Sequence, residues 1–116
     1  MYDIKPQINS LLESIVGKDS VSDAYPDNFN NLPQISFYEA ANSDYLKTSN
    51  VLDEINIQID IWHNRSTGVL AKQVDEKMKE IGFIRTFSAD VPDKNVKHKT
   101  MRFRGIVNKN DLLVYQ

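Results

Sequence analysis

Residues 55–62 of this chain read Ile-Asn-Ile-Gln-Ile-Asp-Ile-Trp, with isoleucine at every second position and polar residues between. Successive side chains of a β-strand point to opposite faces, so the segment predicts a strand with one buried face and one polar face. A helix would instead scatter the four isoleucines around its whole circumference. We therefore expect a sheet that buries one face and shows the other to solvent or to a partner.

Two segments have the spacing of an amphipathic helix. The first is expected to start at Asp3 as its N-cap and to end at Gly17 in a left-handed conformation. The second is expected to start near residues 66–67 and to stop at Gly82. Their apolar stripes are Ile4, Ile8, Leu11, Leu12 and Ile15 in the first helix, and Leu70, Val74, Met78 and Ile81 in the second.

The remaining apolar segments predict strands that alternate with these helices. The expected strands are a short one at 21–25, then 34–40, 55–62 running antiparallel to it, 83–89, 100–108, and 112–115 as a sheet extension or a docked tail. The polar stretches 41–54 and 90–100 are expected to be long connections. We predict one domain over residues 1–116, an α+β fold with a mostly antiparallel β-sheet and two main α-helices packed on it.

Composition narrows the function classes. Fourteen basic and sixteen acidic side chains give a net charge of −2, so nucleic acid is not the expected partner, although a local basic patch could still exist. There is no cysteine, which excludes disulfides and thiolate metal sites. No apolar run approaches the ~20 residues that span a bilayer, and the N-terminus lacks a signal-peptide pattern. We expect no membrane contact and synthesis in a cytoplasm.

Residue patterns for catalysis are weak. The two histidines, His63 and His98, fall on different predicted elements and match no metal-ligand spacing. No serine lies in a Gly-x-Ser-x-Gly elbow, and the four glycines are isolated, so no phosphate-binding loop is expected. We predict no enzyme activity, no catalytic residues, no metal and no cofactor.

Candidate contact residues come from charge and from aromatic side chains. A basic strip runs along residues 94–104 and comprises Lys94, Lys97, His98, Lys99, Arg102 and Arg104. It is either a solvated hairpin that protects an edge strand or a cationic interface for an acidic protein surface or, less readily, DNA. Trp62 either lies half-buried under a helix or anchors a subunit contact. Tyr45 lies in the middle of the predicted 41–54 connection.

The order of elements also carries a resemblance. It rests on Leu32-Pro33-Gln34-Ile35-Ser36-Phe37-Tyr38, on Ile57-Gln58-Ile59-Asp60-Ile61-Trp62 before a polar turn and a helix at 66–81, and on Gly82-Phe83 followed by Met101-Arg102-Phe103-Arg104. In this pattern the chain resembles the tail terminator, or tail-completion (head–tail joining), proteins of long-tailed bacteriophages and prophages. The pattern spans nearly the whole chain and contains no catalytic signature.

The resemblance implies a virion structural protein with an α+β fold that forms a hexameric ring on the tail tube. The implied partners are further copies of the chain, the tail tube protein and a head connector or neck protein. The implied location is the virion tail or neck, after synthesis in the host bacterial cytoplasm. Two alternatives stay open: another neck or head-closure adaptor, and a small nucleic-acid-binding regulator or enzyme that uses the basic strip.

Overall fold

The computed structural model of the protein describes residues 3–23, 26, 32–44, 52–108 and 114–115. Its elements, in chain order, are α1 (Lys5–Val16), the 3-10 turn η1 (Lys18–Ser20), β1 (Val21–Asp23), β2 (Gln34–Asp44), β3 (Leu52–His63), α2 (Gly68–Glu80), β4 (Ile84–Val91), β5 (Lys97–Asn108) and β6 (Val114–Tyr115). The strands form one sheet in the order β1-β2-β3-β5-β4, and β6 pairs with β5. Only the β1–β2 pair is parallel among the described strands. The predicted α+β fold is confirmed.

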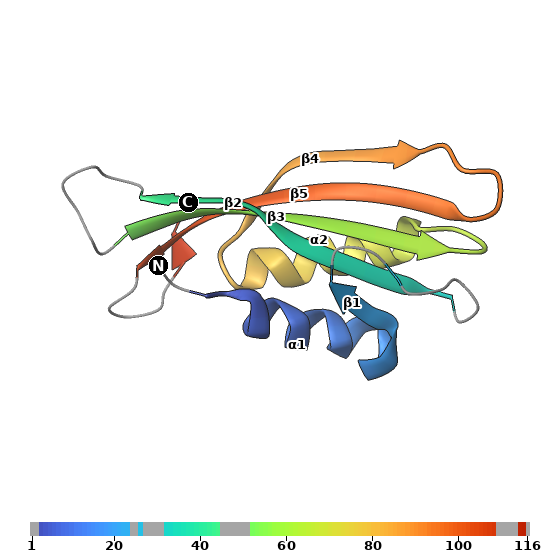
Figure 1. The fold of residues 1–116 in the computed structure, drawn as a ribbon, viewed down its shortest axis with the longest axis horizontal. Helices are drawn as coiled ribbons and strands as arrows, with labels where there is room; N and C mark the ends of the chain where they lie inside the picture. The colour runs from blue at the N-terminus through green and yellow to red at the C-terminus, as the bar shows by residue number, and fades with distance from the viewer. Residues whose placement is uncertain (1–2, 24–25, 27–31, 45–51, 109–113, 116) are drawn as a thin grey trace.

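Both helices lie on the same side of the sheet, as Figure 1 shows. The four isoleucines of β3 point toward them and are fully buried, as the alternation at 55–62 predicts. They pack in one core with apolar side chains of both helices and of β2 and β5. The buried members from the helices are Ile4, just before α1, then Ile8 and Leu12 of α1, and Val74 and Met78 of α2. No helix in the described part of the chain is long and apolar enough to cross a bilayer.

The C-terminus of α2 ends as the sequence predicts. Gly82 adopts a φ of 95°, and its N–H donates to the Lys79 carbonyl at 3.0 Å. The Phe83 N–H donates to the Met78 carbonyl at 2.9 Å, which completes a Schellman motif. Phe83 and Met78 are both fully buried, so this turn also directs the chain from α2 into the core before β4 begins.

The ends of α1 differ from the prediction. The N-cap residue is Ile4, whereas Asp3 lies one position earlier and its carboxylate accepts a hydrogen bond from the Lys5 N–H at 3.1 Å. Asp3 thus still satisfies a free amide of the first turn, from outside the cap position. Gly17 ends the helix with a φ of 100°, but its ψ of 157° is not that of a left-handed helical residue.

The two long connections predicted at 41–54 and 90–100 are wrong. β2 continues to Asp44 and β3 starts at Leu52, so only 45–51 remains between them, outside the described residues. β4 continues to Val91 and β5 starts at Lys97, which leaves the ordinary hairpin loop 92–96. The polar residues in these stretches do not break the strands, because one face of the sheet is not covered by helices.

Candidate interaction surface

The sheet face opposite the helices, called the helix-free face below, draws side chains from four strands. Strand alternation and the pairing registers assign its members. They include Ser36 and Tyr38 of β2, Glu54, Gln58, Asp60 and Trp62 of β3, His98, Thr100, Arg102 and Arg104 of β5, and Ile84, Phe87 and Val91 of β4.

The centre of the helix-free face is a set of polar contacts between β3 and β5. Arg104 Nε donates to Glu54 Oε1 at 2.7 Å, in an ion pair whose side chains are about one-third exposed. Arg102 donates to Gln58 Oε1 from Nε at 3.1 Å and from Nη2 at 3.0 Å. The Gln58 amide in turn donates to the Thr100 hydroxyl. Both arginines on this face are therefore engaged by neighbours on the adjacent strand.

Trp62 lies at the end of the helix-free face nearest the 92–96 hairpin and contacts residues of both neighbouring strands. It stacks on His98, directly opposite in the register, with ring centroids 3.6 Å apart and planes 16° apart. Its Nε1 donates to Ser36 Oγ at 3.1 Å, and His98 Nε2 lies 2.8 Å from Asp60 Oδ1. This network links β2, β3 and β5.

The expectation that Trp62 lies half-buried under a helix is wrong. The alternation that buries Ile61 on the helix side turns Trp62 to the opposite face. It is only 4% exposed there, so in the isolated chain it offers little surface of its own. Its role in a subunit contact stays a prediction.

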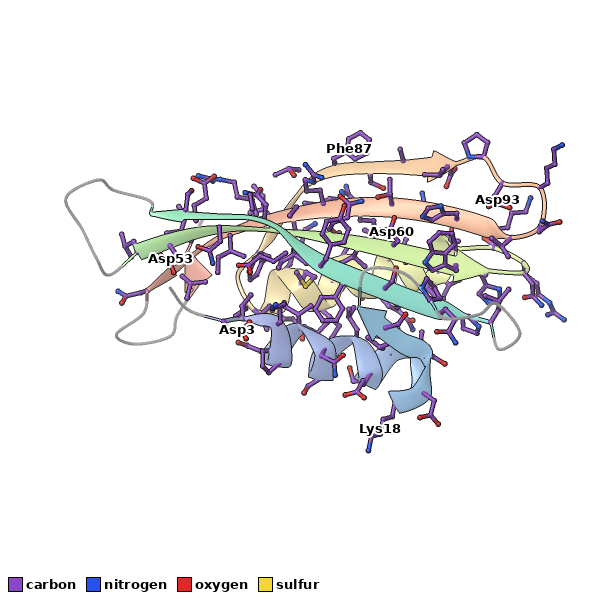
Figure 2. All side chains as sticks on the ribbon, in the orientation of Figure 1. Asp3, Lys18, Asp53, Asp60, Phe87 and Asp93 are labelled. Carbon is purple, nitrogen blue, oxygen red and sulfur yellow. The ribbon has the colours of Figure 1, made fainter. Side chains whose placement is uncertain are left out.

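Apolar side chains flank the polar centre. Tyr38 lies on one side of it, and Ile84, Phe87 and Val91 lie on the other side, along β4. All four are exposed, Phe87 most at 55%, and Figure 2 shows Phe87 pointing away from the helices. Among the described residues, the other large apolar side chain with this exposure is Val69, on α2. The helix-free face thus combines satisfied polar groups with a row of exposed apolar ones.

The exposed apolar row on β4 was not predicted from the sequence, because a β-bulge interrupts the alternation of this strand. The pairing of β4 with β5 shifts between Arg85 and Phe87, which leaves Thr86 as the extra residue. Ile84 and Phe87 consequently face the same side although they are three residues apart. Arg85 turns to the helix side, where its Nη1 lies 3.7 Å from Asp75 Oδ1. Simple alternation from residue 83 cannot reveal this arrangement.

The structure divides the basic strip between two faces. Arg102 and Arg104 share the helix-free face, because residues two apart on a strand point to the same side, whereas Lys97 and Lys99 pair with His63 and Ile61 and point to the other side. Lys99 Nζ lies 3.2 Å from Asp90 Oδ1, and Lys94 lies in the 92–96 hairpin. Tyr45 lies outside the described residues. The strip is therefore not one continuous cationic surface, and the interface role of its residues stays a prediction.

The histidines are also separated by the sheet. His98 belongs to the helix-free face, whereas His63 bonds locally, with Nδ1 3.0 Å from Asn64 Oδ1 and accepting the Arg65 N–H at 3.0 Å. In the part of the chain that the structure describes, no cluster of three or more histidine or carboxylate side chains could hold a metal ion. The absence of a metal, a cofactor and an enzyme activity remains a prediction.

Comparisons with known proteins place the fold. No protein-family model matches the chain, and no curated protein matches it. Among solved structures, a chain in "Virion of native gene transfer agent (GTA) particle" is similar with a TM-score of 0.54 and 14% identity. The match covers 80% of this chain and 81% of that chain. At this identity the likeness establishes a common fold.

Proposed function

We propose that this protein is a structural component of a phage-like virion that acts at the head–tail junction as a tail terminator. The observation that carries the proposal is the shared fold over four-fifths of both chains with a chain of a gene transfer agent virion. The resemblance of the sequence to tail terminator proteins supports the same role from different data. In this role the protein caps the tail tube as a hexameric ring, offers a surface to the head connector, and catalyses no reaction.

The helix-free face is the surface we assign to the contact between neighbouring copies in the ring. Interface cores are enriched in aromatic and other large apolar side chains, and polar groups surround them. Phe87, Ile84 and Val91 on β4, together with Tyr38 on β2, supply such side chains beside the satisfied polar centre. A ring needs a contact between two different surfaces of the same chain, so this face would meet another side of the next copy.

The nucleic-acid alternative has less support from the geometry. A protein that binds a phosphate backbone offers unpaired cations along one path. Arg102 and Arg104 are bonded to Gln58 and Glu54, and Lys99 is paired with Asp90. The neck or head-closure adaptor remains the second candidate, because the shared virion fold supports it equally.

Deletion of the gene in the phage or prophage that encodes it separates these roles. Electron microscopy of a lysate should show overlong tails without heads if the protein terminates the tail. Tails of normal length beside DNA-filled heads that lack tails would indicate an adaptor instead. Normal virions would contradict both roles. Salt-dependent binding of the purified protein to duplex DNA would then favour the regulator.

A complementary experiment uses the purified protein. Light scattering coupled to gel filtration, with and without tail tubes, tests whether rings form alone or only on the tube. Negative-stain images of tubes should show a cap at one end when the protein is present. Tubes that continue to grow after addition of the protein would contradict the proposal.

A further inference from the structure

A second feature lies at the N-terminus of α2, away from the polar centre of the helix-free face. A hollow is formed there between the turn at residues 65–67 and the β4–β5 hairpin at residues 90–98. Its lining includes Arg65 and Thr67 from the turn and Lys97 from the start of β5. The turn and hairpin are far apart in sequence and are brought together because β3 and β4 both pair with β5.

The hollow brings together hydrogen-bond donors that no described residue engages. No described residue pairs with the Arg65 guanidinium or the Lys97 ammonium. Thr67 is the N-cap residue of α2 and is only 7% exposed, but its side chain makes no capping hydrogen bond and no described residue hydrogen-bonds its hydroxyl. Because Thr67 lines the hollow and no described residue engages its hydroxyl, this group can donate a hydrogen bond to a ligand there.

The first turn of α2 adds backbone donors. The Gly68 N–H is satisfied by Ser66 Oγ at 3.2 Å, and the Ala71 N–H by the Thr67 carbonyl at 2.8 Å. The amides between them, of Val69 and Leu70, have no intrahelical acceptor, as in the first turn of any α-helix. The positive end of the helix dipole lies at the same place, which favours a bound anion.

Two carboxylates also line the hollow, and they limit what it can hold. Asp90 is paired with Lys99, and Asp93 Oδ1 accepts the Asn95 N–H at 2.9 Å and the Val96 N–H at 3.4 Å in the hairpin. Both are engaged elsewhere, yet their negative charge repels a dense polyanion such as the DNA backbone. A ligand with a single negative charge suffers less from this repulsion.

We propose that this hollow binds a single carboxylate group, held by Arg65, Lys97, Thr67 and the first-turn amides of α2. Arg65 can hold both oxygens of a carboxylate in a planar pair, and Thr67 and the amides supply further donors. An Asp or Glu side chain of another protein and a small free organic acid share this chemistry. The proposal goes beyond the virion role and can be tested on the isolated protein.

The test is a titration followed by amide chemical shifts in two-dimensional NMR, with acetate and with a capped Gly-Glu-Gly peptide as separate probes. Saturable shifts centred on Val69 and Leu70 are expected. Arg65→Gln should weaken binding about tenfold, because a charge-assisted hydrogen bond is lost. Lys94→Gln is the matched control, because Lys94 carries the same charge in the same hairpin but does not line the hollow. This control should bind as the wild type does.

The remaining outcomes are also distinct. Binding of the peptide at least as tightly as acetate identifies a protein side chain as the source, and binding of acetate alone identifies a small free acid. Absence of shifts at Val69 and Leu70 with both probes overturns the proposal. Tighter binding of inorganic phosphate or of a DNA duplex at the same amides also overturns it, since the site would then serve a phosphate.

Discussion

Replacement of Phe87 by alanine tests whether β4 contributes the centre of an interface. Phe87 is 55% exposed, so somewhat less than half of its surface is already buried within the chain. Complete burial of a phenylalanine is worth about 1.5–3 kcal/mol. The isolated chain should therefore lose only about 1 kcal/mol of stability. The exposed remainder is worth about 1–2 kcal/mol when a partner covers it, and a closed ring loses this amount at every contact.

Two measurements separate these effects. Chemical denaturation at a protein concentration that keeps the chain monomeric should show the small loss of folding free energy. Sedimentation or electron microscopy of mixtures with tail tubes should show a large loss of rings or caps. Val69→Ala is the matched control, because Val69 is 71% exposed on α2 and is not part of the helix-free face. It should leave both the stability and the assembly nearly unchanged.

The reasoning has a clear point of failure. If Phe87→Ala assembles as well as the wild type while Val69→Ala does not, the contact lies on the helix side of the molecule. If Phe87→Ala loses several kcal/mol of folding free energy, the side chain belongs to the core and its exposure has been misjudged. Either result would remove β4 from the proposed interface.

Three further predictions concern the fold and the basic strip. Ile59→Asp should prevent folding, because an unpaired charge in the core costs several kcal/mol and a domain of this kind has a total stability of only about 5–15 kcal/mol. A cooperative thermal melt of this variant, followed by circular dichroism, would contradict the assignment of Ile59 to the core. Trp62→Phe should lower the free energy of unfolding, measured with urea, by about 1–3 kcal/mol, because the buried Ser36 hydroxyl loses its donor. Removing that hydroxyl as well should recover part of the loss. Unchanged stability of Trp62→Phe would show that the hydrogen bond contributes nothing. Lys97→Glu should leave thermal melting nearly unchanged and weaken assembly, whereas Lys99→Glu should lower the melting temperature, since Lys99 faces Asp90 directly across the β4–β5 pair. Equal melting temperatures of the two variants would contradict this register. Normal assembly of Lys97→Glu would show that this end of the basic strip is only solvated surface.

The main elements of the fold were predictable because their signals are local. The alternation at 55–62 determines which face of β3 is buried, and the stripe ending at Met78 with Gly82 after it determines where α2 packs and stops. The strand ends were not predictable in the same way. Asn42 and Asp90 are typical loop residues, yet both lie within strands, because pairing with Ile55 and Lys99 provides backbone hydrogen bonds that composition does not reveal.

The candidate surface was predictable only in part. The spacing of Arg102 and Arg104 places them on one face, and the structure agrees. The partners of these arginines depend on the register between β3 and β5, which brings together residues more than forty positions apart. The apolar row depends on the bulge at Thr86, which single-sequence alternation cannot locate. Pairing between strands far apart in the sequence therefore determines which side chains meet on this face.

The pairing of charges on the helix-free face bears directly on its proposed use. Burial of a free charge at an interface carries a large desolvation cost, whereas a charge that already has hydrogen-bond partners loses less. On this face Arg104 is bonded to Glu54, Arg102 to Gln58, and Asp60 to His98. These groups are largely satisfied and held in place before a partner arrives, so ordering them costs little entropy on binding. In the proposed ring, these polar groups could therefore be covered by a neighbouring copy at a small desolvation cost.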